Sequence, residues 1–263
     1  MKEKYRKISQ EEIRKKLEIQ SVDYIQEYHE MLNKKTCDYF IKKHKQLEQQ
    51  GLVKDGTFNV MEGENEDLDK DIKNSRDIFL SSQDINKDYL KKNISMFNMN
   101  KNDKDKKMFE MLSQAVNKSI YMYCLHTGMD SPWFAGITQD FFDNFFQKKS
   151  KIPKLELDLS VESICLRKYI KNKGWYHDIH YDSRSNLYRV LAIIVYLNDV
   201  KFGGETSFPL LKREVKPTRG KIVVFPSNFT HYHYGRIASS DKYIVASHIM
   251  RLPEKQNKEN KDG

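Results

Sequence analysis

The spacing of apolar residues divides the chain into a helical first half and a β-rich second half. Over residues 106–125, apolar side chains recur every three or four positions, which places them on one face of a helix. The same spacing over residues 22–47 predicts a pair of amphipathic helices that separate near Asn33. We therefore expect helices to precede the sheet.

The second half contains short runs rich in β-branched and aromatic residues, bounded by Gly, Pro, Asn and Asp, which is typical of strands. These runs are residues 162–169, 190–197, 221–225 and 242–250. No segment between them is long enough for a crossover helix. The pattern therefore predicts an antiparallel sandwich or barrel rather than a parallel α/β sheet.

The chain length of 263 residues suits a single domain, and the 38% hydrophobic content is enough for a core. We expect an N-terminal helical extension over residues 1–27 and one domain over residues 28–252. The strand-rich core of this domain is expected at about residues 160–252. Residues 253–263 are charged and lack an apolar anchor, so they are expected to be disordered.

The net charge of +9 comes from 46 basic and 37 acidic residues. Such an excess can attract nucleic acid. However, the lysines are scattered and no arginine stripe is visible, so compositional bias is the favoured explanation. Nucleic acid is not an expected partner.

The three cysteines, Cys37, Cys124 and Cys165, are far apart and form no Cys-x-x-Cys motif. This argues against a disulfide framework and against a cysteine zinc site. No apolar signal segment or membrane-length apolar run is present. These features predict a cytoplasmic protein with no membrane partner.

A candidate metal site begins at His180-Tyr181-Asp182. Residues i and i+2 of a strand point to the same face, so this motif presents an imidazole beside a carboxylate. These are two of the three ligands in the facial triad of non-haem iron oxygenases. Alone the motif is weak, because a surface His-Asp pair is common.

A third ligand can come from the segment after residues 221–225. His231 and His233 occupy alternate positions there, and both are candidates. Nine residues after His233, Lys242 opens the last predicted strand. Its ammonium group can pair with the distal carboxylate of a dicarboxylate cosubstrate whose other end chelates the metal.

Residues 164–250 resemble the catalytic core of the prolyl 4-hydroxylase type of 2-oxoglutarate/Fe(II) dioxygenases. Four motifs occur in the family's order: an arginine followed by Tyr-Leu-Asn, a Gly-Gly-Glu-Thr turn, a Val-x-Pro segment, and the segment with the distal histidine. They are Arg189 with Tyr196-Leu197-Asn198, residues 203–208, residues 215–220 and residues 230–235. The last also resembles the distal-ligand segment of lysyl hydroxylases.

The resemblance implies an α+β fold, with a double-stranded β-helix (jelly-roll, cupin-like) core and flanking N-terminal helices. It implies iron ligation by His180, Asp182 and His233. His233 is preferred to His231 because the second histidine of such a pair binds iron in lysyl hydroxylases, and Gly235 matches the glycine that follows it.

The resemblance further implies that Lys242 binds the C5 carboxylate of 2-oxoglutarate, with Tyr196 and Tyr169 as further cosubstrate contacts. The implied cofactors are Fe(2+), 2-oxoglutarate and O2, with ascorbate as reductant. The implied reaction is hydroxylation of a peptidyl proline, or lysine, with release of succinate and CO2. The substrate is a peptide, protein or small molecule, and the oligomeric state is open.

Several alternatives stay open. The same metal chemistry serves hydroxylases of free amino acids and small molecules, and nucleic-acid demethylases. A non-catalytic metal-binding jelly roll and a zinc hydrolase are further alternatives, although neither explains Lys242.

Other polar residues lie near the predicted site. His177 and Asp178 are expected at the mouth of the pocket. Arg236 is either a substrate-binding cation or a surface residue. His248 stands where relatives often have Trp, and it is expected to be a buried core histidine.

Overall fold

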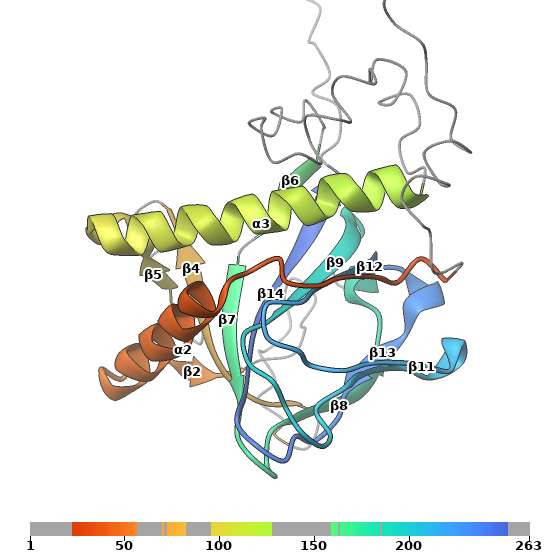
Figure 1. Ribbon diagram of the computed structural model, residues 1–263. Coiled ribbons are helices and arrows are strands. Elements are labelled where there is room, and N and C mark those ends of the chain that lie inside the picture. The colour runs from red at the N-terminus through yellow and green to blue at the C-terminus, as the bar shows by residue number, and fades with distance from the viewer. Residues whose placement is uncertain are drawn as a thin grey trace, which may run out of the picture.

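The computed structural model describes residues 23–56, 70, 73–82, 96–127, 159–162, 164–184 and 186–251. The first 22 residues of the extension expected over residues 1–27, and the tail expected at residues 253–263, lie outside these residues. Over the described residues the fold is α+β, with two α-helices and two sheets built almost wholly from antiparallel pairs (Figure 1). This is the double-stranded β-helix arrangement that the resemblance implies.

The larger sheet has the strand order β1, β12, β9, β14, β7, β4, β2, with β5 paired to β4 and β6 paired to β14. The strands of this sheet span Gln26–Tyr28 (β1), Ile222–Pro226 (β12), Arg189–Tyr196 (β9), Lys242–Arg251 (β14), Ile164–Tyr169 (β7), Arg76–Ser81 (β4), Lys54–Asp55 (β2), Met96–Asn98 (β5) and Leu159–Val161 (β6). Within the described residues, the β4–β5 pair alone is parallel. The four strands predicted from the second half are all present in this sheet.

The smaller sheet has the order β11, β10, β13, β8, β3. Its strands are Arg213–Val215 (β11), Thr206–Phe208 (β10), His233–Gly235 (β13), Trp175–His180 (β8) and Lys73–Asn74 (β3). The two helices are Lys34–Gln49 (α2) and Asp103–Thr127 (α3). They lie together on one side of the larger sheet, and the smaller sheet lies on the other (Figure 1).

Alternation along β9 shows how the core is divided. Leu191, Ile193 and Val195 pack with the helices, whereas Ala192 and Tyr196 pack between the sheets against Phe208 and Phe225. Because the helices cover one face of the sheet and the smaller sheet covers the other, the sequences of β9 and β12 are continuous apolar runs. No helix in the described residues is long and apolar enough to cross a membrane.

The prediction of two helices over residues 22–47 is wrong in its first half. Residues 26–28 form β1, which pairs with Val224, Val223 and Ile222 at the edge of the larger sheet. Glu27 forms ion pairs from this strand with Lys221 and Arg213. Contacts with residues so distant in sequence override the local helical spacing, and the sheet starts two residues before the domain boundary expected at residue 28.

A buried charge cluster joins the two sheets near β8. Asp77 accepts hydrogen bonds from Lys73 at 3.0 Å and from Arg167 Nε at 2.9 and 3.0 Å. Burial alone would raise the pKa of Asp77, but Arg167 and Lys73 outweigh it and hold that pKa well below its usual range. The carboxylate is therefore ionised and shared by two cations.

Replacing Asp77 with alanine is expected to destabilise the fold by about 3–5 kcal/mol, because a buried guanidinium loses the carboxylate that faces it. Urea denaturation followed by circular dichroism measures the change. Asp38→Ala, which removes an exposed ion pair with Arg219, is the matched control and is expected to cost about 1 kcal/mol or less. Equal losses in the two variants would contradict the expectation.

Candidate metal centre

The metal cluster is built where β8 and β13 lie side by side. His180, the last residue of β8, stands directly opposite His233, the first residue of β13, in an antiparallel pair. Their ring centroids are 4.5 Å apart. Asp182 lies just past the strand in the short 3-10 turn Asp182–Arg184 (η4), rather than on the strand as the alternation argument assumed.

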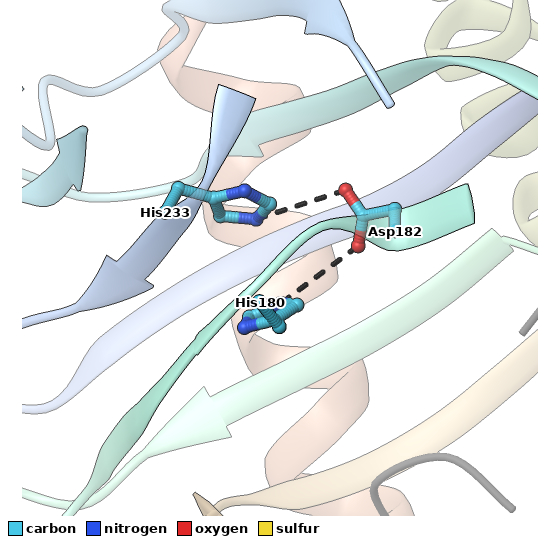
Figure 2. A group of neighbouring side chains, drawn as sticks. All are labelled: His180, Asp182 and His233. Carbon is cyan, nitrogen blue, oxygen red and sulfur yellow. Dashed lines mark ion pairs between the residues drawn. The ribbon is translucent and has the colours of Figure 1, made fainter. Parts of the chain in front are cut away.

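The three side chains point toward one another (Figure 2). One ligand atom from each of His180, Asp182 and His233 lies within 4.8 Å of the others. Asp182 Oδ1 is 3.8 Å from His180 Nε2, and Asp182 Oδ2 is 3.6 Å from His233 Nε2. The structure thus brings together the three residues predicted as ligands.

The charge state of Asp182 suits a metal ligand. Burial alone would raise its pKa, but the neighbouring His233, His248 and His180 outweigh burial and hold the pKa of Asp182 well below its usual range. The carboxylate is ionised at neutral pH. An ionised carboxylate with two imidazoles on a rigid sheet is the donor set of a facial iron(II) triad, so the residues present fit this metal.

The orientation of His233 is set by its surroundings. Its Nδ1 lies 3.1 Å from the carbonyl oxygen of His231, and a proton there leaves Nε2 as the ligand atom. The ring packs against Phe208 and Phe225 at centroid distances of 5.6 and 4.9 Å. These contacts aim Nε2 toward Asp182.

His231 is not part of the cluster. It ends the 3-10 turn Phe229–His231 (η6), which interrupts the extended alternation that would have placed both histidines on one face. Its Nε2 lies 2.7 Å from the carbonyl oxygen of Asp23, so the ring is held by the N-terminal segment. The structure therefore places His233, and not His231, beside His180 and Asp182.

Lys242 is buried close to β13. Its Nζ donates to the carbonyl oxygen of Gly204 at 2.9 Å, and a Cβ added at Gly235 would lie 3.8 Å from Nζ. Gly235 follows His233 by two positions on the same short strand. In the part of the chain that the structure describes, no carboxylate forms an ion pair with Lys242.

Burial lowers the pKa of Lys242 to about 7, with Arg167 acting in the same direction and Glu205 opposing it. A buried ammonium without a counter-ion gains most from an incoming carboxylate. This environment fits the distal carboxylate of a dicarboxylate cosubstrate.

The Gly-Gly turn explains the close approach to Lys242. Gly203 has φ +70°, and a Cβ there would lie 2.1 Å from the carbonyl oxygen of Ile237. Gly204 has φ +76° and presents the carbonyl that Lys242 binds. Only glycine adopts such conformations in this space without strain.

One of the two predicted tyrosines, Tyr169, contacts this lysine, and the other, Tyr196, is bound to Thr206. Tyr169 is the cross-strand neighbour of Lys242, whose Nζ lies 4.5 Å from the centroid of the tyrosine ring. The Tyr196 hydroxyl forms a 2.7 Å hydrogen bond with Thr206 Oγ1. Both tyrosines are buried, and their binding of a cosubstrate stays a prediction.

The expectation for His248 is wrong, because its ring is at the metal cluster rather than in the core. Nδ1 lies 2.7 Å from Glu162 Oε2, and Nε2 lies 3.2 Å from Asp182 Oδ1. Strand parity could have found it, since Lys242 and His248 are six positions apart on β14 and share a face. Tyr176 was also missed; its ring stacks on His180 at 4.0 Å.

The remaining expectations concern polar residues around the site. His177 is exposed on the face of β8 opposite His180, beside Trp175, so it does not face the cluster. The side chain of Asp178 lies outside the described part. Arg236 is exposed and forms a 2.7 Å ion pair with Glu214, as a surface cation does.

Comparison with known proteins bears on both sequence and fold. A family model described as 2OG-Fe(II) oxygenase superfamily matches residues 165–250. No curated protein matches the sequence. Among solved structures, a prolyl hydroxylase from Trichoplax adhaerens, in complex with a hypoxia inducible factor oxygen degradation domain peptide fragment, aligns with a TM-score of 0.57 and 12% identity. The alignment covers 92% of this chain and 91% of that chain.

A prolyl-4-hydroxylase from Pseudomonas putida aligns with a TM-score of 0.51 and 13% identity, over 92% of this chain and 100% of that chain. At such identities the likeness shows a shared fold. The matched segment contains all three clustered ligands and Lys242. Residues 165–250 thus match the 2OG-Fe(II) oxygenase superfamily in sequence, and the three clustered ligands lie within that match.

Proposed function

We propose that this protein hydroxylates a C–H bond of a peptidyl proline, or of a lysine, with release of succinate and CO2. The observation that carries the proposal is the cluster of His180, Asp182 and His233 together with the buried Lys242. The Nζ of Lys242 lies beside Gly235, which follows the distal ligand His233 by two residues on β13. A plain metal-binding site has no use for an uncompensated buried ammonium group.

Each residue has a distinct task in this reaction. His180, Asp182 and His233 hold Fe(II) and leave positions open on one side. Iron bound there with 2-oxoglutarate and O2 supplies the oxidising power for C–H hydroxylation. Lys242 binds the distal carboxylate of 2-oxoglutarate, and Phe208 and Phe225 exclude water from the side of His233.

The choice of a peptide substrate has two supports. The motifs at residues 203–208 and 230–235 resemble those of prolyl and lysyl hydroxylases. The Trichoplax adhaerens relative, which shares the fold, was solved with a bound peptide fragment. Hydroxylation of a free amino acid or another small molecule is the main alternative.

A nucleic-acid substrate has less support, despite the net charge of +9. Six arginines in the described residues are engaged in ion pairs with carboxylates and form no free cationic stripe. They are Arg76, Arg167, Arg189, Arg213, Arg219 and Arg236. The excess charge therefore does not gather around the metal site through these residues.

Succinate production from 2-oxoglutarate tests the proposal. The purified chain is loaded anaerobically with Fe(II), ascorbate is added as the proposed reductant, and air is admitted with or without proline-containing peptides. We expect slow succinate formation alone and faster formation with an accepted peptide, together with a hydroxylated product that is 16 Da heavier by mass spectrometry.

The control for this assay is the double variant His180→Ala, Asp182→Ala, which is expected to give background succinate. His177→Ala, on the opposite face of β8, is expected to match the unmodified chain. Succinate without peptide stimulation would favour a small-molecule substrate. Absence of succinate with every substrate class would point to a non-catalytic metal-binding protein.

A further inference from the structure

The strand that carries His248 changes its neighbour close to the metal cluster. On one side β14 pairs with β7 as far as Ala246 and with β6 from Ile249. Glu162 lies between these two partner strands and is fixed to β14 by its main chain. The N–H of Glu162 donates to the carbonyl oxygen of His248 at 2.8 Å, and Ser247 Oγ donates to the carbonyl oxygen of Glu162 at 3.0 Å.

The side chain of Glu162 is also fixed, by hydrogen bonds from Arg189. Arg189 binds the carboxylate through two parallel hydrogen bonds, from Nε to Oε2 at 2.8 Å and from Nη2 to Oε1 at 2.9 Å. The third arginine nitrogen, Nη1, donates to the carbonyl oxygen of Asp182 at 3.0 Å. One guanidinium therefore fixes both Glu162 and the main chain of a metal ligand.

The imidazole of His248 bridges the two carboxylates. Nδ1 is 2.7 Å from Glu162 Oε2, and Nε2 is 3.2 Å from Asp182 Oδ1. Burial alone would raise the pKa of Glu162, but His248 and Arg189 hold it at about 2. Each ring nitrogen of His248 faces a carboxylate oxygen, Nδ1 that of Glu162 and Nε2 that of Asp182.

We propose that His248 is a positioning residue for the ligand Asp182. Arg189 and Glu162 fix the imidazole, which donates to one carboxylate oxygen and restrains the rotation of the group that must meet the metal. This inference rests on the proposed iron site.

Residues that orient a metal ligand typically contribute about 10–100-fold to metal affinity. We therefore expect His248→Leu to weaken Fe(II) binding by about this factor. His248→Asn, whose amide is too short to reach Asp182, is expected to lose as much. His248→Gln can reach Asp182 with an N–H donor and is expected to recover most of the affinity.

The measurement is anaerobic titration of metal-free protein with Fe(II) in a calorimeter, with no cosubstrate or substrate present. Titration with Co(II), whose visible absorption reports ligand geometry, gives a second readout, and its spectrum is expected to shift in His248→Leu and His248→Asn. His177→Leu, on the exposed face of β8, is the matched control. Thermal unfolding of the metal-free variants checks that the fold is kept.

Absence of Fe(II) binding by the unmodified chain would overturn both this inference and the proposed function. Wild-type affinity in His248→Leu or His248→Asn would overturn the role of His248 and leave the iron site standing. If His248→Leu, His248→Asn and His248→Gln all bind Fe(II) more weakly than the unmodified chain, His248 would be assigned to direct metal ligation instead. If His248→Leu does not fold, the comparison of Asn with Gln at this position decides the matter.

Discussion

Asp182→Ala is expected to abolish Fe(II) binding and to reduce succinate formation to background. Asp182 supplies the only carboxylate of the His180, Asp182 and His233 cluster. Losing a residue that merely supports a ligand costs about 10–100-fold in metal affinity, so losing the ligand itself is expected to cost more than about 100-fold. Two imidazoles alone do not complete a facial site.

Thermal unfolding with and without metal gives an independent check of this result. A ligand present at 100 times its Kd stabilises the folded state by about 2.7 kcal/mol, so Mn(II) or Fe(II) is expected to raise the Tm of the unmodified chain. Asp182→Ala is expected to show no such rise, whereas Asp38→Ala, at an exposed ion pair, is expected to behave as wild type. A metal-dependent Tm in Asp182→Ala would place the metal elsewhere.

Lys242→Met is expected to raise the KM for 2-oxoglutarate strongly while leaving Fe(II) affinity unchanged. Truncating one partner of a buried charge pair costs about 2–5 kcal/mol, which corresponds to roughly 30-fold or more. The metal-free variant is expected to be at least as stable as wild type, because a buried ammonium without a counter-ion is replaced by an apolar side chain.

The pH dependence of cosubstrate binding tests the same lysine. Burial lowers the pKa of Lys242 to about 7, and only its protonated form attracts a carboxylate. The Kd for 2-oxoglutarate is therefore expected to be constant below pH 7 and to rise above it, by at most about tenfold per pH unit. Lys242→Arg, which stays charged, is expected to remove this rise; a flat profile in the unmodified chain would contradict the assignment.

Much of the fold follows from local sequence patterns. The helix predicted over residues 106–125 is confirmed as Asp103–Thr127, since its apolar residues repeat at helical spacing over many turns. The four strands of the second half are confirmed because β-branched runs end at turn residues. Residues 26–28 were predicted to be helical and are not, since their conformation depends on pairing with β12, almost two hundred positions later.

Among the residues of the site, too, some were found from local sequence patterns and others depend on contacts between distant segments. His180 and Asp182 are two positions apart in the sequence, so a short motif was sufficient to find them, although Asp182 lies in the turn after the strand rather than on it. The role of His248 depends on Glu162 and Asp182, which are 86 and 66 positions away along the chain. Strand parity indicates only which face His248 occupies, whereas its partners depend on which strands are adjacent.

The sequence by itself determined the strand runs, the ligand types, their order and the cation that follows them. Tertiary structure decided which histidine completes the cluster, because the turn at Phe229–His231 and the carbonyl of Asp23 hold the ring of His231 away. It also decided that Lys242 is buried with no carboxylate in an ion pair with it among the described residues, and that His248 meets Asp182. These properties arise from contacts between segments far apart in the chain, which local spacing does not encode.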